Sequence, residues 1–303
     1  MSVPAMTPET ATLVPRAATS RTSLRTFAAR LRSAAWLGWQ IESNWTDPFM
    51  FVVYAVMRPL AMALILAGMY WAVAGQALRR EAFTGFYVAN AFHVYVTQVL
   101  VGMGWLVVEE REDYETLKYV YTSPIGMLTY LAGRSSVKLV LATISMLLAL
   151  SVGWFLLGLR WEWSHVAWGP LAVSIVLGLV ACTYLGFLVA GVALLLPRAA
   201  ITLNEGLAVA FYLLCGVIFP VDLLPRGLQE LALGLPFTHW YEALRRFLLG
   251  HGASTRLSAW PDQALLTALL GTTVVFVVVA RWGYFALERR ARQLGRLDQT
   301  TLF

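Results

Sequence analysis

Charged side chains are scarce in this sequence, and their scarcity excludes an ordinary soluble protein. Only 13% of the 303 residues are charged, whereas 59% are hydrophobic. Soluble domains carry roughly 25% charged residues, which they need to cover a core of this size. Lipid is the solvent that tolerates a surface with so few charges, so the composition indicates an integral membrane protein.

Lysine and cysteine are nearly absent as well. Neither lysine, Lys118 or Lys138, lies in a Gly-x4-Gly-Lys-Ser/Thr loop, so the sequence offers no ATP-hydrolysing motif of that kind. Cys182 and Cys215 lie inside apolar stretches, where we expect packing rather than a disulfide, a metal ligand or a nucleophile. No His, Cys and carboxylate cluster has the spacing of a metal site. We therefore expect neither an enzyme nor a cofactor in this chain.

Apolar stretches are abundant, and six of them are long enough to be candidate membrane spans. A spanning helix needs roughly 20 mostly apolar residues. The candidates are residues 49–74, 83–108, 127–159, 168–196, 203–219 and 265–287. Pro197 ends the fourth and Pro220 ends the fifth. The sequence predicts an all-α membrane domain of six transmembrane helices over residues 47–288.

Basic residues next to the apolar region predict its orientation. Five arginines lie between Arg16 and Arg32, and four lie between Arg289 and Arg296. Cytoplasmic segments beside spans carry an excess of Lys and Arg, and six crossings place both ends on one side. We expect both termini in the cytoplasm at the plasma (cell inner) membrane. Five arginines in the expected outer loops oppose the rule: Arg79, Arg80, Arg245, Arg246 and Arg256. The placement also favours the lipid bilayer over nucleic acid as the partner of the net charge of +6.

The two ends differ in character. Residues 1–21 are rich in Ser, Thr, Pro and Ala without an apolar run, so we expect a disordered cytoplasmic tail rather than a signal peptide. Residues 22–46 place apolar and basic side chains on different faces at helical spacing, with Trp36 and Trp39 among them. They predict an amphipathic helix in the membrane interface. A helix packed on the protein's own loops is the alternative. Residues 289–303 form a basic cytoplasmic tail.

The loop between the second and third expected spans concentrates acidic charge. Five of the 17 acidic residues lie between Glu109 and Glu115. Apolar residues follow at helical spacing, and a Ser-Pro pair closes the segment at Pro124. An acidic loop gains nothing from an anionic leaflet, whereas a helix with acidic and apolar faces suits docking in a groove on a soluble partner. A solvated charged loop is the alternative reading.

A second unusual segment follows the fifth expected span. Pro220 and Pro225 break the chain there, and apolar residues continue without enough length to cross a bilayer. The pattern suits short helices that re-enter the outer leaflet, packed against protein. An ordinary outer loop with a hydrophobic face is the alternative. Glu242 and Arg245 are three residues apart on one of these helices, so we expect them to pair.

Both segments resemble motifs of the type-2 ABC exporter permeases. In that family a Glu-Arg-Glu-x-Gly-Thr-Leu-Glu-like run, ending in Ser/Thr-Pro, links the second and third spans. This chain reads Glu110-Arg111-Glu112-Asp113-Tyr114-Glu115-Thr116-Leu117-Lys118, then Ser123-Pro124. It departs at Glu115, where Gly is usual, and at Lys118, where Glu is common. Because the departure removes a flexible point, we expect the helix to run more continuously through Glu115.

The later segment is similar to the family's Ser-Gly-x-x-Phe-Pro-x-x-x-Leu-Pro and Pro-x-Thr-x-x-x-Glu-x-x-Arg stretches. The resemblance implies a re-entrant outer segment carried by Phe219, Pro220, Pro225, Pro236, Thr238, Glu242 and Arg245. It also implies that the acidic loop is a coupling helix, which seats in a separate ATPase subunit. The implied coupling residues are Glu109, Glu110, Arg111, Glu112, Asp113, Glu115, Thr116, Leu117, Tyr121 and Pro124.

The resemblance further implies a division of labour between chains. ATP and Mg would be bound by the partner ATPase subunit, and two permeases, as a homodimer or a heterodimer with a homologue, would enclose the pathway. An ion-coupled secondary transporter is the alternative function, but it would show internal repeats and relay residues near the midplane. A membrane-embedded lipid-modifying enzyme would need paired carboxylates inside the membrane.

Ionisable and polar residues inside spans are candidate functional residues. Arg58, His93 and Gln98 are the candidates here. Arg58 is expected to snorkel toward the headgroups, and His93 to make an interhelical hydrogen bond. Asn204 and Glu205 are expected to cap the fifth span.

Overall fold

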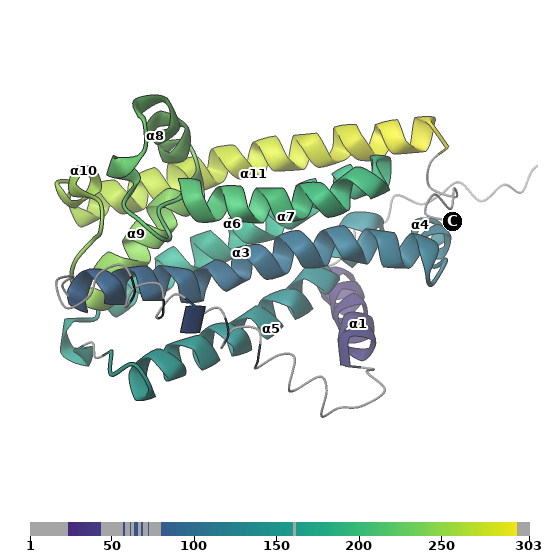
Figure 1. Ribbon diagram of the computed structural model, residues 1–303. Coiled ribbons are helices and arrows are strands. Elements are labelled where there is room, and N and C mark those ends of the chain that lie inside the picture. Colours follow the sequence, from purple (N-terminus) through teal and green to yellow (C-terminus); the bar gives the residue numbers. More distant parts are fainter. Residues whose placement is uncertain are drawn as a thin grey trace, which may run out of the picture.

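A computed structural model shows a bundle of helices (Figure 1). It describes residues 24–43, 80–159 and 162–295, together with positions 57, 61, 64, 65, 68 and 72. Every regular element in these ranges is a helix. The long ones are α1 (Leu24–Ser43), α3 (Arg80–Glu112), α5 (Met127–Phe155), α6 (Trp168–Leu195), α7 (Pro197–Leu214) and α11 (Asp262–Gln293). The short ones are α4 (Leu117–Thr122), η1 (Trp163–His165), η2 (Val221–Leu223), α8 (Arg226–Leu233), α9 (Pro236–Leu249) and α10 (Thr255–Ser258).

Four of the described helices are long and apolar enough to cross a membrane: α3, α5, α6 and α11. They confirm the second, third, fourth and sixth expected spans as apolar helices of sufficient length. The first expected span, residues 49–74, lies outside the continuously described residues. α3 and α11 extend beyond their predicted ends, since charged residues at both ends of these helices continue the helical hydrogen bonding.

The fifth expected span differs from its prediction in both boundaries. α7 begins at Pro197, where a proline fits the first helical turn, and ends at Leu214. Gly216, with a φ of 78°, turns the chain before the predicted end at Phe219. The apolar part of α7, Thr202–Leu214, is shorter than the four candidate spans. Because the helix starts at Pro197, Asn204 and Glu205 lie within it and do not cap it, contrary to expectation.

The lateral surface of the bundle is apolar. α11 exposes Val274, Val275, Val278 and Val279 along one stripe, and α5 exposes Ile144 and others on its outer face. A water-soluble protein rarely exposes contiguous apolar surface of this kind. The surface suits a lipid environment, in agreement with the composition.

The two ends of the bundle are built differently. Figure 1 shows α4, α1 and the C-terminal end of α11 at one end, here called the α4 end. The helices α8, α9 and α10 gather at the opposite end, here called the α9 end. α1 lies crosswise to α5 and packs against it. The two sequence motifs singled out above are therefore at opposite ends of the molecule.

Candidate functional site

The acidic loop forms a compact turn at the α4 end. α3 stops at Glu112, Glu115 adopts the left-handed conformation with a φ of 49°, and α4 begins at Leu117. The expectation of a more continuous helix through Glu115 was wrong. The chain has to reverse between the neighbouring helices α3 and α5, and a left-handed residue makes that reversal. A non-glycine residue in this conformation costs about 1–2 kcal/mol, which explains why glycine fits the position.

Glu110 lies inside the protein, behind this turn. Its side chain is 2% exposed and accepts hydrogen bonds from the hydroxyls of Thr116 and Tyr130. An Nη2 atom of Arg134, also 2% exposed, lies 3.7 Å from the Glu110 carboxylate. Burial without partners would be costly for this carboxylate, and the three groups together offset that cost. Glu110 therefore holds the turn to α5 and has no surface to offer a partner.

Arg111 is also an internal residue. It is buried, and its Nη2 donates a 2.8 Å hydrogen bond to the carbonyl of Leu194 near the end of α6. Leu117, the first residue of α4, is buried in the hydrophobic core. Both residues were predicted to belong to the coupling segment, and the structure places both where they join the segment to the bundle.

α1 packs against α5, the helix whose side chains also hold Glu110. Arg134 donates to the carbonyl of Gly38, and Lys138 forms an ion pair with Glu42. The backbones of the two helices approach closely, since a Cβ on Gly133 would lie 2.5 Å from the Cβ of Ala34. α1 thus packs on the protein through its small residues. Its position relative to a membrane stays a prediction.

Tyr121 connects α4 to α11. The guanidinium of Arg292 lies 4.8 Å from the centre of the Tyr121 ring, and Arg292 pairs with Glu288 at 2.6 Å. Burial raises the pKa of the Tyr121 phenol, and the nearby Glu288 carboxylate raises it further. The phenol therefore stays protonated. Tyr121 faces the C-terminal helix and, like Glu110, is an internal contact.

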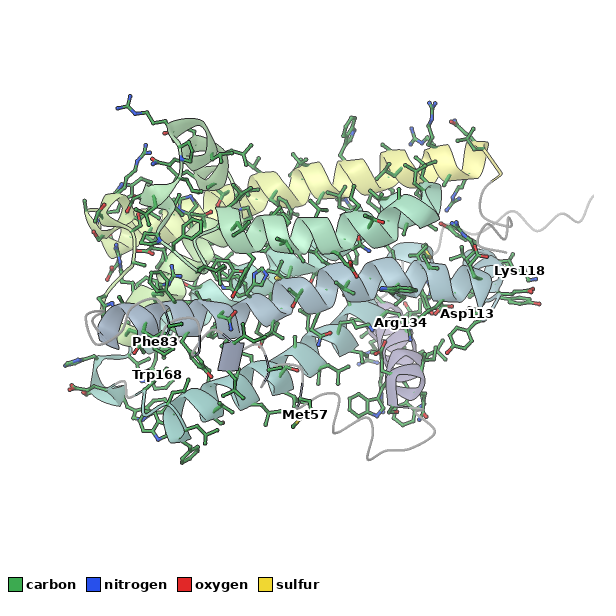
Figure 2. The ribbon with its side chains drawn as sticks, in the orientation of Figure 1. Met57, Phe83, Asp113, Lys118, Arg134 and Trp168 are labelled. Carbon is green, nitrogen blue, oxygen red and sulfur yellow. The ribbon has the colours of Figure 1, made fainter. Side chains whose placement is uncertain are left out.

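The remaining residues of the turn form an exposed tip. The exposed side chains are Asp113, Tyr114, Glu115, Lys118, Tyr119 and Thr122, hereafter the α4 tip. Tyr119 is 65% exposed and Tyr114 is 53% exposed. Lys118 lies 3.2 Å from Glu115. Figure 2 shows Asp113 and Lys118 at the outside of this end and Arg134 nearer the middle of the bundle.

The structure thus divides the predicted coupling residues into three groups by exposure. Asp113 and Glu115 belong to the tip, and Pro124 is exposed beside it. The half-buried residues are Glu109, Glu112, Thr116 and Tyr121, and the buried residues Glu110, Arg111 and Leu117 hold the tip in place. Sequence reasoning passed over the two exposed tyrosines. For Tyr119 the signal was present, because an inward face made by Leu117 and Tyr121 leaves the residue two positions from each pointing outward. Tyr114 precedes α4, so this pattern does not extend to it.

The α9 end contains the second motif. Arg245 is buried and donates hydrogen bonds to the carbonyls of Gly85 at 2.9 Å and Val217 at 3.2 Å. It also lies 3.6 Å from Glu242, the pairing that the spacing predicted. One side chain therefore connects α9 with the start of α3 and the chain after α7.

The other residues of this motif shape the same end. The Glu242 carboxylate accepts hydrogen bonds from the backbone N–H groups of Ala253 and Ser254, beyond the end of α9. The Thr238 hydroxyl donates to the carbonyl of Ala232 at the end of α8.

The prolines of the motif fit the starts of helices. Pro220 precedes η2, Pro225 precedes α8 and Pro236 opens α9. Phe219 is half-buried. α9 is almost entirely buried against the protein, unlike an ordinary surface loop.

The intramembrane candidates have different outcomes. His93 Nδ1 lies 2.8 Å from the hydroxyl of Tyr241, which gives the interhelical contact expected for it. Gln98 is half-buried on α3. Arg58 lies outside the described residues. Among the described residues, no group of three or more His, Cys, Asp or Glu side chains is placed to hold a metal ion.

Comparison with known proteins gives a family. No curated protein matches the chain in a sequence search. A protein-family profile described as ABC-2 type transporter matches residues 34–249. The match covers more than half of the chain and includes the second half of α1, both motifs and the helices between them. The chain belongs to the ABC-2 type transporter family and is a multi-pass membrane transport permease.

Proposed function

We propose that this chain is the membrane-spanning subunit of an ATP-driven exporter, coupled to a separate ATPase subunit by the α4 tip. The observation that carries the proposal is the division of the acidic turn into an exposed tip and a buried base. Tyr119 and Tyr114 project outward, whereas Glu110 and Arg111 are fixed in the bundle.

The buried base makes the tip a stiff extension of several helices. Glu110 connects the turn to α5 through Tyr130 and Arg134, and Tyr121 connects α4 to α11 through Arg292. Displacement of the tip by a partner would therefore move the ends of α3, α5 and α11 together. A flexible charged loop would absorb the same displacement, so the rigid base favours coupling over a merely solvated loop.

The chemistry of the tip describes the surface that receives it. Two exposed tyrosines supply contact area of the kind that dominates protein interfaces. Asp113 and Glu115 against Lys118 leave a net negative tip, so we expect a cleft with apolar walls and a basic rim on the ATPase. ATP and Mg are bound by that subunit in this proposal.

The remaining parts of the proposal follow from the family and from the charge pattern. Two permeases, identical or homologous, enclose the pathway, and ATP binding to the partner subunits drives alternating access through the tips. The α4 end and both termini face the cytoplasm at the cell inner membrane, and the α9 end faces outward. The arginines that flank the apolar region support this orientation.

The test is the replacement of one tip residue. We expect Tyr119→Ala to weaken binding of the purified permease to its ATPase by about tenfold, because truncation of a tyrosine that becomes buried as a hot spot of an interface costs more than about 1 kcal/mol. Transport and ATPase stimulation should fall together. Leu223→Ala is the matched control, since Leu223 is 72% exposed at the opposite end. Equal effects of the two substitutions would refute the assignment. So would unchanged binding of the ATPase subunit after both Tyr114 and Tyr119 are replaced.

A further inference from the structure

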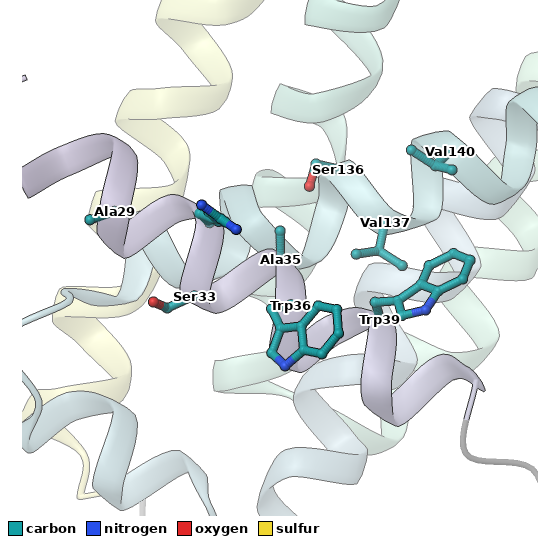
Figure 3. Close-up of a pocket in the computed structure, with 9 residues that line it drawn as sticks. Ala29, Ser33, Ala35, Trp36, Trp39, Ser136, Val137 and Val140 are labelled. Atoms are coloured by element: carbon teal, nitrogen blue, oxygen red, sulfur yellow. The ribbon is translucent and has the colours of Figure 1, made fainter. Parts of the chain in front are cut away.

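A groove of about 860 Å³ lies between α1 and α5. Its described lining residues are Ala29, Arg32, Ser33, Ala35, Trp36, Trp39, Ser136, Val137 and Val140. Figure 3 shows the indoles projecting from α1, and Val137 and Val140 on α5. This volume is of the size that holds small organic ligands, which is about 300–1,000 Å³.

The lining of the groove has two chemical parts. The polar part consists of the positively charged Arg32 and the hydroxyls of Ser33 and Ser136. The rest is apolar or aromatic, with Trp36 63% exposed and Trp39 40% exposed. A cation next to an aromatic and aliphatic trough matches a ligand that has an anionic head and a hydrocarbon tail.

The location of the groove points to the same class of ligand. Val140 and Ile144 continue from the groove along the exposed apolar face of α5. A hydrocarbon chain leaving the groove would therefore stay on apolar surface. Arg25 and Arg30 add positive charge to α1. These features are those of the boundary between headgroups and acyl chains, where arginine and tryptophan are both stable.

We propose that this groove binds an anionic phospholipid of the cytoplasmic leaflet, with the phosphate beside Arg32 and an acyl chain along Trp39 and Val140. The proposal rests on the cytoplasmic placement of the α4 end given above. Because α1 is joined to α5 by the Lys138–Glu42 pair and to Arg134 through Gly38, the bound lipid would fix α1 against the base of the α4 tip.

Lipid binding can be measured on the full chain without any ATPase. The purified, delipidated protein is titrated with phosphatidylglycerol or with phosphatidylcholine, and bound lipids are counted by native mass spectrometry. We expect Arg32→Gln to weaken the affinity for the first bound phosphatidylglycerol by about fivefold, since one arginine near an anionic lipid contributes about that factor. The affinity for phosphatidylcholine should be unchanged. Arg25→Gln is the matched control, because it removes the same charge from the same helix outside the groove.

A second variant tests the trough independently of charge. Val140→Trp fills the apolar part, so binding of both lipids should fall. Equal losses from Arg32→Gln and Arg25→Gln would mean diffuse attraction and would overturn the proposal. Labelling of a Val140→Cys variant with N-ethylmaleimide gives a further check. If the cysteine is protected to the same extent with and without added phospholipid, the protein itself or a second copy covers the groove, and the proposal is overturned. Failure of the unaltered protein to bind phosphatidylglycerol, with ATPase coupling intact, would overturn this proposal and leave the proposed function standing.

Discussion

Replacement of Arg134 by methionine tests the buried base of the α4 tip. Methionine preserves most of the length of the side chain and removes the guanidinium. The Glu110 carboxylate would lose the charge that lies 3.7 Å away, and the Gly38 carbonyl would lose its side-chain donor from α5. The hydroxyls of Thr116 and Tyr130 would remain as the donors to Glu110.

The size of the effect follows from burial. Breaking a buried ion pair by removing one partner costs about 3–5 kcal/mol. Because two hydroxyl donors remain on Glu110, we expect the lower end, about 3 kcal/mol. For a chain of this size that corresponds to a fall in Tm of about 5–10 °C. The measurement is thermal unfolding of the purified protein in detergent, followed by tryptophan fluorescence.

An exposed pair at the other end provides the control. Arg256 lies 3.0 Å from Glu230, closer than the Arg134 pair, but the two side chains are 49% and 68% exposed. We expect Arg256→Met to cost less than about 1 kcal/mol, since solvent screens such pairs. Equal shifts for Arg134→Met and Arg256→Met would refute the reasoning from burial.

A double variant separates the pair from general damage to packing. Glu110→Gln removes the unpaired charge that Arg134→Met leaves behind, so the double variant should be less destabilised than the sum of the two single variants. Strict additivity would show that the two side chains do not depend on each other. The Arg134–Glu110 contact would then add nothing to the order of the base beyond its other contacts.

Two further predictions concern single backbone positions. Glu115→Gly should raise Tm by about 2 °C by relieving about 1 kcal/mol of left-handed strain, whereas Glu115→Ala, which removes the same charge and keeps the Cβ, should not; equal stabilisation by both would contradict the strain. Gly252→Ala should destabilise the α9 end by about 1–3 kcal/mol in thermal unfolding, since a Cβ there would overlap the Glu242 carboxylate. Gly227→Ala, in α8 with open space around it, is the control and should be neutral or slightly stabilising; a similar loss at both positions would argue against the close contact.

The helical architecture was accessible from the sequence because lipid imposes a simple rule. Long apolar runs have few alternatives to spanning helices, so the ends of α3, α5 and α6 were predicted within about four residues and those of α11 within about six. α7 was displaced because its start depends on how Pro197 fits a helical turn and its end on the left-handed Gly216. Local backbone preferences of this kind shift boundaries without changing the hydropathy.

The roles of the acidic residues were less accessible. Glu109 to Glu115 are neighbours in sequence, yet Glu110 is buried and Glu115 is exposed. Their separation depends on partners contributed by α5, such as Tyr130 and Arg134, which no local pattern reveals. The conformation of Glu115 was predicted wrongly for a related reason, since the need for reversal arises from the packing of α3 against α5.

The burial of α9 has a consequence for the way the protein is made. α9 packs against α3, α6 and α11, and the rings of Phe237 and Phe276 meet at 5.8 Å between α9 and α11. α11 is synthesised after α9, so Phe237 remains without its contact with Phe276 until the last long helix is inserted. The packing of α9 can therefore be completed only after synthesis of α11, and a ribosome stalled before residue 262 would leave an intermediate in which the face of α9 that meets α11 is still uncovered.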